Sequence, residues 1–156
     1  MRPLRSFDEF LTLGIVRKTF CDKLRAKSLV EEATKRELFL SELGKKLNLS
    51  DSNANYFIEA SYDILIELIR AKLFSDGFNV SAQGNHEAEV TYLQKLGFLE
   101  SEVRFMNDLR YFRNGILYYG KSYGSEYGKN VLGFLNSMYP QLKKLFGDVK
   151  HEQIHS

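Results

Sequence analysis

The residues best suited to chemistry lie between positions 110 and 127, where basic side chains alternate with tyrosines and glycines. The run reads RYFRNGILYYGKSYGSEY and holds five of the nine tyrosines in the chain. Guanidinium groups hold phosphate oxygens through paired hydrogen bonds, and tyrosine rings stack on nucleobases. A surface for RNA or nucleotides is therefore one interpretation of the run, although composition alone favours tyrosines that close the end of a helical bundle. Its nucleic-acid-binding candidates are Arg110, Arg113, Tyr119 and Lys121.

Two other interpretations of this run stay open. Tyrosine and arginine are also the residues that anchor protein–protein interfaces. Alternatively, the tyrosines close one end of a helical domain and keep their hydroxyl groups in water.

Few other residues have the types and spacing of a catalytic or metal site. His86 is expected to begin a helix, where it either faces the site or, as the favoured interpretation, is a half-exposed structural histidine. His151 and His155 are four residues apart, as a metal-binding pair would be, but no third ligand accompanies them. Glu87 and Glu89 do not share a helix face, so we expect them to stabilise a first helical turn rather than act as a catalytic pair. No metal and no cofactor is predicted.

The composition is typical of one folded domain in a reducing compartment. The chain has 156 residues, of which 44% are hydrophobic and 27% charged. Cys21 is the only cysteine, which excludes an internal disulfide and a multi-cysteine metal site. No stretch approaches the ~18 apolar residues of a membrane span, and the N-terminus lacks the apolar segment of a signal peptide. We therefore expect a cytoplasmic protein without membrane contact.

Charge is distributed unevenly although the net charge is only +2. Residues 1–46 carry 11 Lys and Arg against 7 Asp and Glu, and residues 101–150 carry 8 against 4. Residues 47–100 carry 3 against 8. A basic face formed by the two ends would attract phosphates. Solvated helix faces that differ by chance would give the same counts, so both interpretations stand.

Helices must position these residues, and the first is predicted to begin after Ser6. Ser6 and Glu9 have the spacing of a capping box, and the helix is expected to run to the high twenties. Its inward positions would include Phe10, Leu13, Phe20 and Leu24. A second start at Ser28 leads into a helical pattern over residues 30–43. The pattern does not decide whether these are one bent helix or two.

The most apolar helix is predicted over residues 54–74. Helix-capping residues fill positions 50–53, and Asp76 and Gly77 are expected to end the helix. A helix that is apolar over most of its circumference lies at the centre of a bundle. Residues 78–84 are expected to form a loop, and Asn85 to cap a short helix that ends at Gly97.

Two further helices are predicted around residues 105–116 and 125–146. No β-hairpin signal, internal repeat or linker is present. The fold class is therefore all-α, an antiparallel (up-down) bundle of four to five helices. One domain is expected over residues 1–156, with its core at about 7–146 and a polar C-terminal tail at 147–156.

The chain resembles the HEPN domain family over residues 7–146. The resemblance rests on the long paired helices, the DGF sequence after the central helix, the GNHE sequence at 84–87 and the RYFRNGILYYG run at 110–120. It implies an up-down bundle that often dimerises with its motif at the interface. Many members cleave RNA without a metal, and others bind nucleotides or pair with a small nucleotidyltransferase in toxin–antitoxin modules.

The family motif is an arginine, then a polar residue, with a histidine about five positions after the arginine. In this chain Arg113 matches the arginine and Asn114 the polar residue, while the histidine position holds Tyr118. These three are the catalytic candidates that the resemblance implies. A phenol, with a pKa of about 10, is a poor proton carrier near neutral pH.

Together, the residues and the resemblance predict an RNA- or nucleotide-binding module that is weak or inactive as a ribonuclease. Any activity would be that of a metal-independent endoribonuclease. The alternative is a dimeric protein-interaction module that pairs with a nucleotidyltransferase, as in toxin–antitoxin systems. A homodimer is expected in either case.

Overall fold

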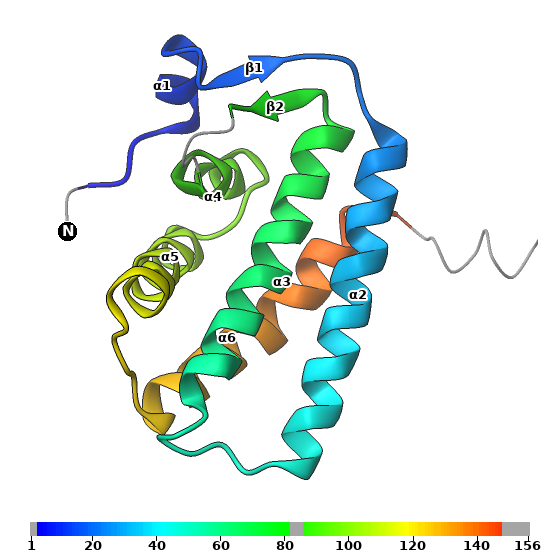
Figure 1. Cartoon of the computed structure of the whole chain (residues 1–156). Coiled ribbons are helices and arrows are strands. Elements are labelled where there is room, and N and C mark those ends of the chain that lie inside the picture. The colour runs from blue at the N-terminus through cyan, green and yellow to red at the C-terminus, as the bar shows by residue number, and fades with distance from the viewer. Residues whose placement is uncertain (1–2, 82–85, 148–156) are drawn as a thin grey trace, which may run out of the picture.

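The computed structural model describes residues 3–81 and 86–147, and these residues form a helical bundle with one small sheet (Figure 1). The helices are α1 (Phe7–Thr12), α2 (Lys23–Lys46), α3 (Ala54–Ser75), α4 (His86–Lys95), α5 (Glu100–Tyr119) and α6 (Ser125–Lys144). The strands are β1 (Val16–Lys18) and β2 (Phe78–Val80). The all-α prediction is thus confirmed. The described residues contain six helices, however, not four or five.

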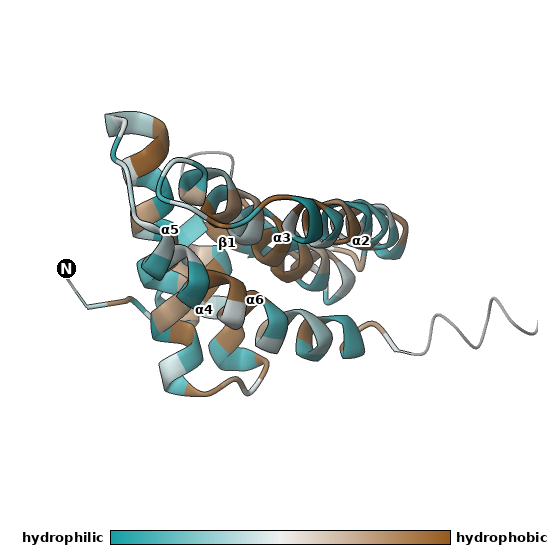
Figure 2. Cartoon of the chain, turned by 90° about the horizontal axis from the view of Figure 1, so that it is seen from below, coloured by the Kyte–Doolittle hydropathy of each residue, from teal (hydrophilic) through white to brown (hydrophobic). Residues whose placement is uncertain are grey.

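Helix α3 is the centre of the bundle, as its apolar circumference predicted. Leu65, Leu68 and Ile69 are fully buried, and α3 contacts α2, α4, α5 and α6. Figure 1 shows α2 lying antiparallel beside α3, with α4 and α5 on the other side of α3. Seen from below in Figure 2, α6 crosses one side of the layer formed by α2 and α3. Each buried leucine of α3 stabilises the fold by about 1.5–3 kcal/mol.

The prediction of one long first helix is wrong. Helix α1 begins at Phe7 with the Ser6 hydroxyl as its cap, but it ends at Thr12. Gly14 adopts a φ of 73°, a left-handed conformation that stops the helix. A separate helix, α2, begins after Asp22, whose carboxylate accepts a hydrogen bond from Arg25 N. The expected inward positions Leu13, Phe20 and Leu24 are exposed, whereas Phe10 is buried.

The expected loop at 78–84 is also wrong for its first residues. Phe78–Val80 forms β2, which pairs antiparallel with β1 in the register Val16–Val80, Arg17–Asn79 and Lys18–Phe78. Both strands have three residues and lie about 60 positions apart along the chain, so no local pattern marks them. The sheet joins the segment after α3 to the segment after α1. Asn85, the expected cap of α4, is outside the described residues.

Candidate functional site

Helix α5 carries five of the six sequence candidates, all except Lys121. The helix continues through Gly115 to Tyr119 and ends at Gly120, so it extends past the predicted end near residue 116. Arg110 and Arg113 are one helical turn apart and therefore share a face. Both are partly buried.

Arg113 is bound to α3. Its Nη2 donates to Asp63 Oδ1 at 3.1 Å, and its guanidinium lies 5.3 Å from the centre of the Tyr62 ring. The Arg113 side chain is 18% exposed, and its Nε is buried with no hydrogen-bond partner among the described residues. An unsatisfied buried donor costs about 1–3 kcal/mol, and a bound anion that supplied an oxygen would offset that cost. A phosphate held on the Nε–Nη2 edge would have to displace Asp63.

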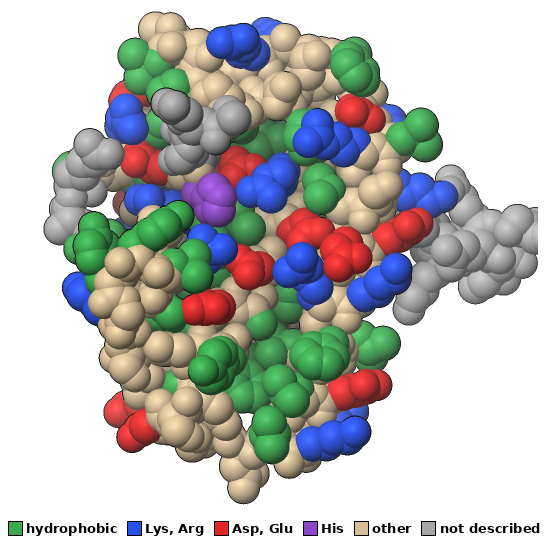
Figure 3. Space-filling model, in the orientation of Figure 1, with side chains coloured by type: hydrophobic (Ala, Val, Ile, Leu, Met, Phe, Trp, Pro, Cys, Tyr) green, Lys and Arg blue, Asp and Glu red, His purple; other side chains and the backbone are tan. Residues whose placement is uncertain are grey.

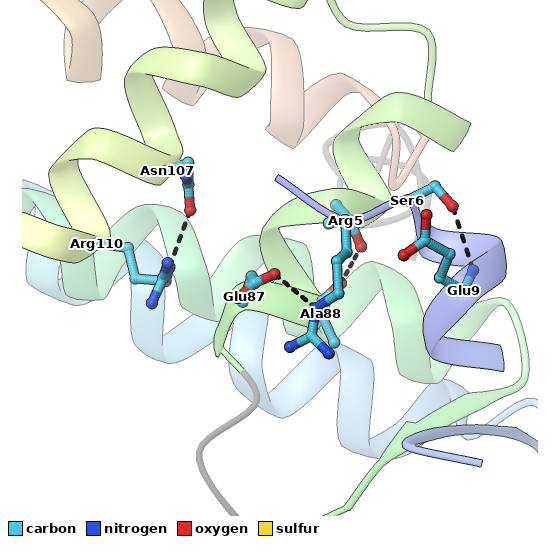
Figure 4. A network of polar contacts seen from close by, with 8 residues as sticks. Arg5, Ser6, Glu9, Glu87, Ala88, Asn107 and Arg110 are labelled. Atoms are coloured by element: carbon cyan, nitrogen blue, oxygen red, sulfur yellow. Dashed lines mark hydrogen bonds and ion pairs between the residues drawn. The ribbon is translucent and has the colours of Figure 1, made fainter. Parts of the chain in front are cut away.

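Arg110 is held by an uncharged group. Its Nε donates to Asn107 Oδ1 at 3.0 Å, one turn earlier on α5. Figure 4 shows this pair on α5 and, separately, the bond between Glu87 of α4 and Arg5. In residues 3–81 and 86–147, no carboxylate lies within salt-bridge distance of Arg110. Arg110 therefore adds a positive charge that no described ion pair neutralises.

His86 lies beside these arginines at the start of α4. Its Nδ1 is 2.8 Å from the hydroxyl of Tyr62, and the two rings stack at 5.8 Å with an 18° angle. Burial lowers the pKa of the imidazole below its usual value of 6.5, while Glu89 opposes that shift. Three nearby arginines lower the pKa further, namely Arg70, Arg113 and Arg110. The lowered pKa favours the neutral imidazole at pH 7, and the histidine expected to be structural lies within the candidate site.

The two acids of the first turn of α4 each hold an arginine. Glu89 is buried and accepts two hydrogen bonds from Arg70 of α3, at 2.5 and 3.0 Å. Glu87, also buried, accepts one from Arg5 at 3.3 Å. Burial of a carboxylate requires such a partner. These residues join α4 to α3 and to the N-terminal segment, and each carboxylate is bonded to a different arginine.

An open cleft of about 630 Å³ lies against His86. Its polar lining includes Arg25, Arg70, His86, Glu89 and Tyr118, and residues of α3 and β2 form its apolar wall. Figure 3 shows basic and acidic side chains gathered around a histidine in this hollow. Arg110 and Arg113 do not line the cleft but act on His86 from the α5 side.

The remaining candidates are spread around the end of α5. Tyr118 is 72% exposed and lines the same cleft as His86. Tyr119 is exposed and Asn114 partly exposed, and neither lines the cleft. Lys121 is exposed on the loop after α5, where its carbonyl accepts a hydrogen bond from Asn55. The structure therefore brings Arg110, Arg113 and Tyr118 to the surroundings of His86, but not Tyr119 or Lys121.

Sequence reasoning missed three members of this site. Tyr62 and Arg70 are on the buried helix α3, where their positions looked like ordinary parts of a core helix. Arg25 is on α2, and in the described part of the chain it forms no ion pair but stacks on Phe74 at 4.1 Å. A charged residue inside the most apolar helix, such as Arg70, was the one available signal.

No group of three metal-ligating side chains occurs among the described residues. His151 and His155 are outside them. None of the helices in the described ranges is long and apolar enough to cross a membrane.

No protein-family model, curated protein or solved structure matches this chain. The geometry of the cleft and of α5 therefore supplies the argument for function.

Proposed function

We propose that this chain is a HEPN-like module that binds RNA or nucleotides at the α3–α4–α5 site and cleaves RNA weakly or not at all. The proposal is supported by the hydrogen-bond donors that Arg110 and Arg113 of α5 leave unused. Arg110 has no carboxylate partner in the described ranges, and Arg113 uses a single N–H on Asp63. Guanidinium groups with unused donors beside a neutral histidine suit a phosphate.

The protonation chemistry supports weak catalysis. Metal-independent cleavage of RNA needs a proton carrier that titrates near neutral pH. Tyr118 offers a phenol where the family has a histidine. His86 offers an imidazole, but its Nδ1 is already bonded to Tyr62 and its pKa is lowered by burial. Binding is thus better supported than turnover.

The proposal is tested by fluorescence anisotropy with a labelled single-stranded RNA. Arg110→Gln should weaken binding about tenfold, because a charge-assisted phosphate contact contributes about 1.5–3 kcal/mol. Arg113→Lys should weaken binding as well, since lysine cannot reproduce the planar fork of donors. Affinity should fall as salt rises, because phosphate contacts release counterions.

Arg104→Gln is the matched control. Arg104 lies on the same helix, but its side chain is 68% exposed and pairs only with Glu100 one turn away. This variant should bind RNA like the wild type. Equal losses for Arg104→Gln and Arg110→Gln would show general charge attraction rather than a site.

The alternative function, a dimeric interaction module that pairs with a nucleotidyltransferase, is favoured by one observation. The last turns of α5 expose four large side chains, those of Tyr111, Leu117, Tyr118 and Tyr119. Contiguous exposed aromatic surface marks an interface, and a second copy of the chain is the simplest occupant. Light scattering should then give twice the 18.1 kDa chain mass, and Tyr119→Glu should give monomers. A wild-type monomer at high concentration contradicts this function.

A further inference from the structure

We propose that this site prefers a terminal phosphate monoester to an internal phosphodiester, because His86 takes up a proton when the ligand binds. The inference rests on the proposed function and names the ligand class for the same site. A terminal monoester occurs on a free nucleotide and at a phosphorylated RNA end. His86 is outside the RNA-binding residues that the sequence indicates, so its role is a separate claim.

The contact between Tyr62 and His86 is suited to both protonation states of the imidazole. Burial of Tyr62 raises the pKa of its phenol further above 10, so the hydroxyl keeps its proton and can donate to Nδ1 of neutral His86. When the imidazole is charged, Nδ1–H donates to the same phenol oxygen. In both states Nε2 carries a proton. The nitrogen that is left for a ligand in the cleft is thus always a donor.

The charged groups around His86 leave a positive balance even while it is neutral. The groups from each packed element are Asp63 and Arg70 of α3, Glu89 of α4, and Arg110 and Arg113 of α5. Glu87 of α4 is bonded to Arg5. Arg25 of α2 lines the same cleft and forms no ion pair in the described part of the chain. Four arginines against two carboxylates leave two net positive charges, and protonation of His86 raises this to three.

The two kinds of phosphate carry different charges. A diester has one negative charge, whereas a monoester has a second pKa near 6 and is mostly doubly charged at pH 7.5. A dianion therefore neutralises more of the positive charge of the site than a monoanion does, and it stabilises the charged imidazole more strongly. A dianion opposes the burial and the arginine charges that keep the imidazole neutral. Binding of a monoester should therefore draw a proton onto His86.

The test compares adenosine 5′-monophosphate with its methyl ester by isothermal titration calorimetry at pH 7.5. Both probes share the base and the sugar and differ in phosphate charge. The wild type should bind the monophosphate about tenfold more tightly, as expected for one additional charge pair in a partly screened site. Titrations in buffers of different ionisation enthalpy should show uptake of close to one proton for the monophosphate and close to none for the ester.

A second pair of probes separates the two sources of a monoester. These are single-stranded tetraadenylate RNAs with a 5′-phosphate and with a 5′-hydroxyl. If the natural ligand is an RNA end, the phosphorylated RNA should bind more tightly than the mononucleotide. If it is a free nucleotide, the mononucleotide should bind at least as tightly as the phosphorylated RNA.

His86→Asn tests the residue directly. The amide can still accept from Tyr62 but cannot gain a proton, so the preference for the monophosphate should fall to about twofold or less and proton uptake should disappear. Tyr62→Phe is a second variant in case the first does not fold. It removes the acceptor for Nδ1–H of charged His86, so proton uptake should decrease.

Two outcomes distinguish a failure of this inference from a failure of the proposed function. Equal affinity for both esters without proton uptake, with binding still dependent on Arg110, overturns this inference but leaves the proposed function intact. No binding of any nucleotide or RNA contradicts the proposed function itself.

Discussion

Gly77→Ala probes the junction that holds β2 beside the cleft. Gly77 follows α3 with a φ of 86°, and its carbonyl accepts a hydrogen bond from Thr19 N at 2.7 Å. A Cβ at this position would lie 2.9 Å from the Thr19 carbonyl oxygen and 3.3 Å from Cys21 Sγ. Residues 19–21, which precede α2, therefore pack directly against the backbone of Gly77.

Two costs add in this variant. The left-handed conformation costs a residue with a Cβ about 1–2 kcal/mol. The contact with a backbone oxygen forces residues 19–21 to move, and overpacking of this kind costs about 1–3 kcal/mol. The sum is roughly 2–5 kcal/mol, which corresponds to a fall in melting temperature of roughly 5–20 °C for a domain of this size.

Thermal unfolding followed by circular dichroism measures this effect. The matched control is Gly133→Ala, because Gly133 is inside α6 and, apart from its chain neighbours and the adjacent helix backbone, no heavy atom of the described residues lies within 4 Å of its Cβ position. Alanine there should stabilise the protein by about 0.5–1 kcal/mol. A Gly77→Ala protein that melts with the wild type, or two variants that shift in the same direction, would refute the reasoning.

Leu68→Ala should lower the free energy of unfolding by about 2–5 kcal/mol because Leu68 is fully buried in α3, whereas Leu117→Ala, at an exposed position, should lower it far less. Urea unfolding of both variants measures this, and equal losses would contradict the burial of Leu68. Acid should destabilise the protein through His86. The folded-state pKa of His86 is lowered, so the unfolded chain binds more protons below about pH 6.5, and the free energy of unfolding falls until the pH drops below the folded-state pKa. His86→Asn should remove this part of the pH dependence. An unchanged profile of stability against pH in that variant would contradict the prediction. Tyr118→His should raise RNA cleavage at least about tenfold, since general acid–base catalysis contributes about 10²–10⁴-fold, and a gel assay that shows no gain would argue against the family placement of Tyr118.

The sequence prediction was most accurate for the central helix, because the composition of that segment alone indicates that it is buried. Residues 54–74 are apolar almost all round, and α3 is the buried centre of the bundle. The capping box at Ser6 correctly placed the start of α1. Its end was missed because Gly14 occurs within an apolar pattern that otherwise continues.

Features made by distant segments could not be predicted. The pairing of Val16 with Val80 depends on how α2 and α3 return the chain, not on any local signal. The same holds for the site, where Arg113 meets Asp63 across 50 residues and His86 meets Tyr62 across 24. Arg110 and Arg113 share a face of α5, but only the packing of α5 against distant segments brings them near a histidine.

Arg110 and Arg113 of α5 are proposed to form a phosphate-binding site. The most direct test is the affinity of Arg110→Gln for a labelled single-stranded RNA, beside the wild type and Arg104→Gln, over a range of salt concentrations. Arg110→Gln should lose about tenfold in affinity and show a salt dependence reduced by roughly one phosphate contact, with Arg104→Gln unchanged. Wild-type affinity and salt dependence in Arg110→Gln would contradict this proposal.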